Sequence, residues 1–190
     1  FREALRGWHT PHLNFVFADR EHIGFVMAGL LPDRAQGSGL TPVPGWSGEW
    51  EWRGFVPFEQ LPQSWDPPEG FIATANQRIR AQGEGPHLSW DFMTGIRAAR
   101  IVELLQAKPK LSAADFTAIH LDAKSLLGPR FVAAVKALGL KPRTAHARMA
   151  LDRLLAWDGV CATDGVGASV YEAWQLAAQR RAMEPSLGKA

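Results

Sequence analysis

The sequence predicts an α+β protein in which the strands come first and the helices follow. Two observations support this prediction. Residues 13–75 contain short runs of aromatic and β-branched residues, separated by Gly, Pro and polar turns. From Met93 onward, apolar residues recur at spacings of three and four, which is the period of an amphipathic helix. We therefore expect a β-rich sheet with a Trp-rich loop over residues 1–91 and a helical region over residues 92–190.

The first strands are predicted to form a β-hairpin. Residues 13–19 and 23–29 are aromatic and β-branched runs, and the polar residues between them suit a turn. Residues 31–44 carry Gly and Pro without a period, so they are expected to be a loop that leads into the Trp-rich stretch.

Residues 39–78 contain four of the eight Trp of the chain. If residues 48–55 are extended, the even-numbered Trp46, Trp50 and Trp52 share one face, because side chains two apart in a strand point the same way. The Asp-Pro-Pro-Glu-Gly run at residues 66–70 predicts a turn. Residues 70–75 after it are predicted as a short apolar strand that brings Asn76 to an edge.

The remainder is predicted to be helical, with helices at about residues 93–108, 112–126, 128–139, 144–157 and 169–183. Ser112 and Asp115 have the spacing of a capping box for the second helix. Gly139 is expected to end the third helix, because glycine accepts the backbone conformation that terminates helices.

Composition excludes several classes of partner. The chain is 46% hydrophobic and 21% charged, as expected of a globular protein with a core. Its net charge is +2 and it has no basic block, so we expect no binding to nucleic acid or to an anionic membrane. The longest apolar runs, such as IGFVMAGLL, are too short to span a bilayer.

Two segments, PVPGWSGEWEWRGFVPFEQLP and then PPEGFIATANQR, resemble the β-chain of the penicillin acylase family of N-terminal nucleophile hydrolases. The resemblance continues through IRAARIVELLQAKPKLSAADFTAIHLDAKSLL. It implies that the antiparallel strands belong to an αββα sandwich followed by a helical segment. It also implies a periplasmic or secreted precursor that cleaves itself, with the rest of the β-chain and the α-chain as partners.

The resemblance further implies hydrolysis of N-acyl amide bonds in small molecules such as penicillins, cephalosporins or acyl-homoserine lactones. The family's nucleophile is a Ser at the β-chain N-terminus, and its own α-amine acts as the base. Phe1 cannot serve as that Ser. The chain is therefore expected to be an internal piece of the β-chain that is inactive in isolation.

Two residues are candidates for the catalytic site, Asn76 and Arg97. On its own, Asn76 is more typical of a turn former, and Arg97 of a solvated helix residue. The resemblance assigns Asn76 as the side chain of the oxyanion hole, which donates a hydrogen bond to the oxygen that becomes negative during amide hydrolysis. It places Arg97 beside the active site, where it orients Asn76. Arg100 is the alternative if the alignment of this helix is shifted.

No cofactor is assigned from the sequence. The six His residues show no metal-binding spacing with Cys or acidic residues. The resemblance implies a structural calcium ion in the full-length protein. However, His87 stands where the family has an Asp ligand, with Asp91 a few residues further on, so no metal ligand is assigned.

An alternative function rests on the aromatic residues Trp46, Trp50, Trp52 and Phe55. Aligned rings could form the platform of a non-catalytic module that binds carbohydrate or another ligand. The structural interpretation of these residues, which we favour, is that they pack between the layers of a sandwich.

Overall fold

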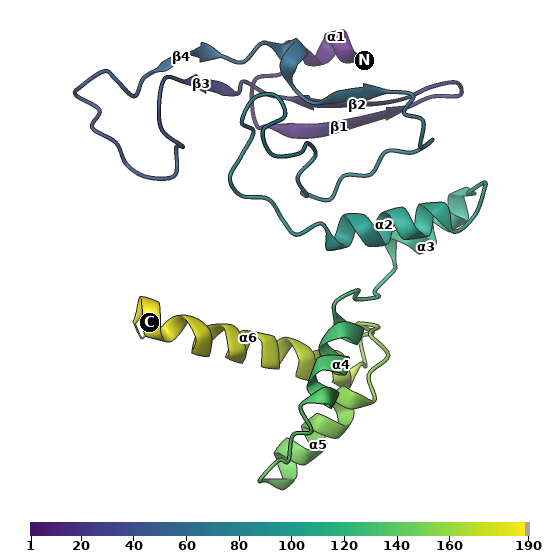
Figure 1. The fold of residues 1–190 in the computed structure, drawn as a ribbon. Coiled ribbons are helices and arrows are strands. Elements are labelled where there is room, and N and C mark those ends of the chain that lie inside the picture. The colour runs from purple at the N-terminus through teal and green to yellow at the C-terminus, as the bar shows by residue number, and fades with distance from the viewer. Residues whose placement is uncertain (189–190) are drawn as a thin grey trace. The chain divides into compact units, whose positions relative to one another are not determined.

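The computed structural model describes residues 1–188. By its internal contacts the chain separates into two compact units, Phe1–Lys108 and Pro109–Ala190. The first unit contains α1 (Arg2–Leu5), β1 (Leu13–Ala18), β2 (Ile23–Ala28), β3 (Pro32–Arg34), β4 (Trp52–Phe55), the 3₁₀-helix η1 (Phe58–Gln60), β5 (Gln63–Trp65) and α2 (Ile96–Gln106). The second contains α3 (Ala113–His120), α4 (Gly128–Ala137), α5 (Ala145–Leu155) and α6 (Val166–Leu187). Figure 1 shows antiparallel strands followed by helices, which confirms the predicted α+β class.

The predicted hairpin is present. Strands β1 and β2 pair antiparallel, with Leu13 opposite Ala28 and Ala18 opposite Ile23 (Figure 1). In the turn, the Asp19 carboxylate accepts hydrogen bonds from the backbone amides of residues 21 and 22 at 2.8 and 2.7 Å. Strand β2 has a partner on each side, and its side chains supply much of this unit's buried core.

The partner on the other side of β2 is β5, which gives the sheet order β1-β2-β5. Gly24 lies opposite Trp65 in this pairing. A Cβ atom at Gly24 would lie 2.8 Å from the Trp65 ring, so only glycine lets the indole cross the strand there. The Trp65 ring also stacks against the ring of Phe17, with 5.8 Å between the two centroids.

Two predictions for the Trp-rich stretch are wrong. The expected loop at residues 31–44 contains β3, which pairs with β4. Only Trp52–Phe55 is extended, and residues 45–50 form turns. Alternation along a strand therefore does not apply to Trp46 and Trp50, and the three Trp do not share a strand face.

The strand expected at residues 70–75 is also absent. A strand needs a neighbour to hydrogen bond with its backbone, and in residues 1–188 this segment pairs with none of the named strands. The backbone amide of Ala75 instead receives a side-chain partner, the Gln77 Oε1 atom at 2.6 Å. The chain bends at residues 75–77 as a result.

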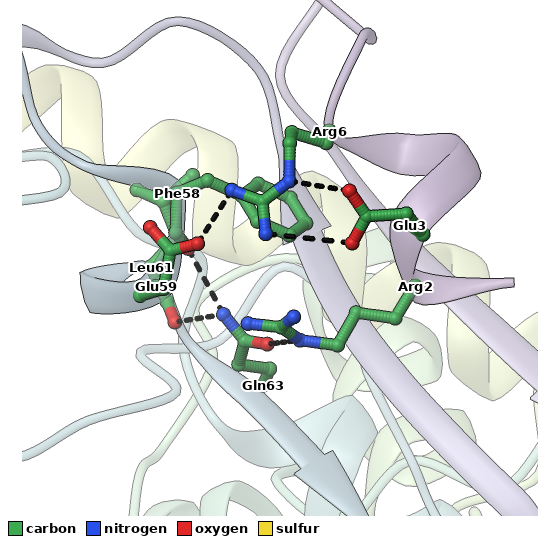
Figure 2. A network of polar contacts seen from close by, with 7 residues as sticks. All are labelled: Arg2, Glu3, Arg6, Phe58, Glu59, Leu61 and Gln63. Carbon is green, nitrogen blue, oxygen red and sulfur yellow. Dashed lines mark hydrogen bonds and ion pairs between the residues drawn. The ribbon is translucent and has the colours of Figure 1, made fainter.

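The N-terminal helix α1 is joined to the segment around η1 and β5 by a polar network (Figure 2). The Arg6 guanidinium contacts Glu3 at 2.7 Å and also Glu59. Arg2 donates to the side-chain oxygen of Gln63. Hydrogen bonds from Arg6 lower the pKa of both Glu3 and Glu59. The network thus links the start of the chain to residues 58–63.

The second unit has its core where α4, α5 and α6 meet. Val135, Leu154 and Tyr171, one from each helix, are buried against one another. The Phe131 ring packs edge-on against Tyr171 and Trp174, at 5.1 and 5.6 Å between centroids. None of the helices within residues 1–188 is both long and apolar enough to cross a bilayer.

The helix ends are partly as predicted. Ser112 and Asp115 form the predicted capping box, and α4 ends shortly before Gly139, which has φ 56°. The second predicted helix is shorter than expected, since α3 ends at His120. Helix α6 is longer than expected at both ends.

Asp66 fastens the hairpin turn to the end of β5. One carboxylate oxygen accepts the Ile23 amide at 2.9 Å, and the other lies 2.6 Å from Nδ1 of His22. The hydrogen bond from the Ile23 amide, followed by that from His22, lowers the pKa of Asp66 below its ordinary value of 3.8. A carboxyl group whose pKa falls on folding stabilises the protein above its unfolded pKa, and this contribution disappears as the pH falls through the folded pKa.

We therefore expect Asp66→Asn to lower Tm at neutral pH, and the difference from wild type to shrink as the pH falls below 3.8 and through the lowered pKa of the folded state. Thermal unfolding of both proteins across this pH range measures it. Glu69→Gln is the matched control, because Glu69 is exposed in the same turn and has no hydrogen bond or ion pair within residues 1–188. Identical Tm values for wild type and Asp66→Asn at neutral pH would contradict this role.

Candidate active site

Asn76 and Arg97 lie together in a cleft of the first unit, with a volume of about 430 Å³. The hairpin, residues 74–79, residues 88–92 and the start of α2 line this cleft. Its apolar lining comes from Leu13, Met27, Ile79, Leu88 and Phe92. It therefore combines an apolar wall with a few converging polar groups, as small-molecule sites commonly do.

The backbone of Asn76 is in the left-handed region, with φ 61°. Few residues other than glycine adopt this conformation, and Asn does so more readily than most. The Asn76 carbonyl accepts a hydrogen bond from the Met93 amide at 2.9 Å, just before α2. The preceding residue, Ala75, is buried. Asn76 is thus held on both sides although its own side chain is exposed.

The Arg97 side chain is hydrogen bonded to the side chain of Asn76. Its Nη2 atom donates to Oδ1 of Asn76 at 2.6 Å and to the carbonyl oxygen of Ala75 at 2.9 Å. A guanidinium group has only donors, so the amide atom facing it must be the oxygen. The amide nitrogen of Asn76 therefore points away from Arg97, and within residues 1–188 it has no hydrogen-bond partner. The predicted contact between the two side chains is present.

Arg100, the alternative to Arg97, makes a different contact. It forms an ion pair with Glu103, one turn along α2, at 2.9 Å. It is not among the residues that line the cleft.

Several residues of the cleft were not found by sequence reasoning. Asn14 and Met27 reach it from the hairpin, and His12 from the residue just before it, all more than 45 positions from Asn76. No local pattern marks them, because the fold alone brings them there. Gln77, which directly follows Asn76, also lines the cleft.

The cleft presents an amide N–H beside a fixed positive charge. This pair can stabilise an oxygen atom that becomes negative during a reaction, since donors held in place do not need to reorganise. The hydroxyl of Ser89 is engaged in a turn, donating to the Asp91 carbonyl at 3.1 Å and accepting the Asp91 amide at 3.0 Å.

The His87 side chain carries no oxygen atom that could bind calcium. Calcium prefers carboxylate and carbonyl oxygens. The His87 ring instead lies against Trp90, with centroids 4.5 Å apart. In the part of the chain that the structure describes, no group of three or more His, Cys, Asp or Glu residues could hold a metal ion.

The aromatic residues of the Trp-rich stretch differ in burial: Trp50 is half-buried with its ring against Gly37, whereas Trp46 and Trp52 are exposed. Trp46 is 89% exposed and Trp52 is 56% exposed in this chain, so residues 1–188 do not themselves supply the sandwich packing expected for these two residues, which stays a prediction for the larger protein. The rings of Trp52 and Phe55 meet at 64°, edge to face.

Comparison with known proteins gives consistent results. The family model described as penicillin amidase matches residues 1–190. The chain is 38% identical over 179 residues to penicillin acylase 2 proenzyme of Pseudomonas sp. (strain SE83), covering 94% of this chain and 23% of that protein. It is 36% identical over 182 residues to acyl-homoserine lactone acylase QuiP of Pseudomonas fluorescens, covering 90% of this chain and 22% of that protein.

A solved structure, the thermostable penicillin G acylase from Alcaligenes faecalis, matches with a TM-score of 0.62 and 24% identity. The match covers 85% of this chain and 30% of that chain, and it supports the fold. The present chain spans about a quarter or less of the length of the curated relatives named above. Because the family model matches every residue, the chain belongs to the penicillin amidase family.

Proposed function

We propose that this chain is the part of an N-acyl amidohydrolase that supplies the oxyanion donor and one wall of the substrate cleft. The observation that carries the proposal is the contact of Arg97 with the amide oxygen of Asn76, which leaves the amide nitrogen to face a substrate. The relatives are named as penicillin and acyl-homoserine lactone acylases. The proposed substrates are accordingly penicillins, cephalosporins, acyl-homoserine lactones or related N-acyl compounds.

In the proposed reaction, a nucleophile attacks the acyl carbonyl carbon and the carbonyl oxygen becomes negative. The Asn76 N–H donates to this oxygen, and the Arg97 charge adds positive potential behind the amide. Collapse of the intermediate expels the amine and leaves an acyl-enzyme, which water then hydrolyses. We propose that the nucleophile is the family's N-terminal Ser, supplied by another segment of the precursor, and that the mature protein is periplasmic or secreted.

Assays of the complete protein test this proposal. Incubation with phenylacetyl and fatty-acyl anilides and with acyl-homoserine lactones should release the free carboxylic acid from at least one of these substrates. The isolated 190-residue chain should release none, because it contains the oxyanion donor without the proposed nucleophile. If the complete protein hydrolyses no N-acyl amide, and oligosaccharides quench its Trp fluorescence, the carbohydrate-binding alternative is favoured.

A further inference from the structure

We propose that Gln77 is a positioning residue, whose side chain holds the backbone before Asn76 in the conformation that directs the Asn76 amide into the cleft. This inference rests on the proposed function, in which that amide acts on the substrate. Gln77 makes two hydrogen bonds to the main chain. Its Oε1 atom accepts from the Ala75 amide at 2.6 Å, and its Nε2 atom donates to the Ala73 carbonyl at 3.2 Å.

These two bonds replace the pairing that a neighbouring strand would give. Residues 71–75 are apolar and suited to a strand, but within residues 1–188 they join none of the named strands. Their amide and carbonyl groups still require partners. The Gln77 carboxamide satisfies one group of each kind and closes a short ring from residue 73 to residue 77. The chain turns sharply inside this ring, at Asn76.

The ring explains how a left-handed residue is maintained here. Such a conformation is unfavourable for a residue with a side chain and persists where the surroundings over-determine it. Gln77 fixes the Ala75 amide, Arg97 fixes the Ala75 carbonyl and Met93 fixes the Asn76 carbonyl. Of these three contacts, only that of Gln77 is made by the residue adjacent to Asn76.

Gln77→Leu in the complete protein tests the inference, because leucine has a similar bulk and no hydrogen-bonding group. We expect kcat per mature enzyme to fall by about tenfold to a hundredfold, with KM within about twofold, since the amide would be displaced by a fraction of an ångström from the reacting oxygen. Gln77→Glu keeps the acceptor for the Ala75 amide and loses the donor to Ala73. It should show a smaller loss, and it replaces Gln77→Leu in the experiment if the leucine variant does not mature.

A double-mutant cycle with Asn76→Gly distinguishes positioning from general stabilisation. Glycine accepts the left-handed φ and removes the amide. If Gln77 acts through Asn76, then Gln77→Leu causes no further loss of kcat in the Asn76→Gly protein. If the two losses multiply, the positioning role is overturned.

Gln63→Leu is the matched control. The Gln63 Nε2 atom also bridges backbone groups, donating to the carbonyls of Phe58 and Leu61 at 2.9 and 3.3 Å (Figure 2). Gln63 does not line the cleft, so the kcat of the Gln63→Leu protein should equal that of the wild type.

The outcomes also separate this inference from the proposed function. An unchanged kcat in Asn76→Gly overturns the oxyanion role, and with it the inference. A reduced kcat in Asn76→Gly, together with an unchanged kcat in the Gln77 variants, overturns the inference alone.

Discussion

Asn76→Gly in the complete protein should lower kcat by roughly 10²–10³-fold, the loss typical of one oxyanion-hole donor, and should change KM little. Glycine is a better probe here than alanine, because φ at this position is 61° and a Cβ atom without the compensating amide would add strain. The loss would then report the missing N–H group and not a rearranged backbone.

Asn76→Asp is the companion variant. It retains an oxygen for Arg97 to bind, and it replaces the amide N–H by a second carboxylate oxygen. Its kcat should fall at least as far as that of Asn76→Gly, because a negative charge would face the developing oxyanion. A kcat within a few-fold of wild type in either variant would contradict the oxyanion role and leave Asn76 as a turn residue only.

Arg97→Lys should lower kcat by about tenfold or more, the cost of losing a hydrogen bond from a charged donor. One nitrogen of Arg97 bridges two oxygens, and the planar guanidinium fixes the direction of both of its N–H bonds. A lysine keeps the positive charge but has a freely rotating ammonium group on a different stem. The Asn76 amide would therefore lose its fixed orientation while the local charge remained.

Arg100→Lys is the control on the same helix. Arg100 pairs with Glu103, and lysine can also form an i,i+3 ion pair on a helix. We expect its kcat to stay within a few-fold of wild type. Steady-state kinetics of both variants, with the concentration of active sites titrated, provide the comparison. Equal rates for Arg97→Lys and wild type would remove the arginine from the mechanism.

The elements that the sequence predicted correctly are those set by local chemistry. The hairpin alternates apolar residues around a polar turn, and the capping box of α3 needs only Ser112 and Asp115 at their observed spacing. The helices α4 and α5 follow from apolar periodicity and end near glycines. In these cases all the deciding interactions lie within about a dozen positions of one another.

The elements that it missed depend on pairing between distant residues. The strand β3 exists because residues 52–55 pair with it, and β5 exists because β2 offers a free edge. Conversely, residues 70–75 have strand-like composition, yet no neighbouring strand satisfies them in the described chain. The local sequence pattern favours an extended backbone. Whether the segment becomes a strand depends on whether the sheet places another strand beside it.

The candidate site also depends partly on features that can be read from the sequence and partly on the three-dimensional fold. Asn76 and Arg97 were predicted from the resemblance to a family, and the structure joins them by a hydrogen bond of 2.6 Å. The left-handed backbone of Asn76 and the two bonds of Gln77 were not predicted, because a glutamine after an asparagine has no characteristic conformation. The cleft residues from the hairpin could not be identified without the fold.

The most direct test of the oxyanion role is a crystal structure of the complete protein with a tetrahedral boronate or phosphonate adduct on its nucleophile. We expect the negatively charged oxygen of the adduct to lie about 2.7–3.1 Å from Nδ2 of Asn76, with Arg97 still bound to Oδ1. An adduct whose oxygen is bound by other donors, with the Asn76 amide nitrogen beyond hydrogen-bonding distance, would contradict it.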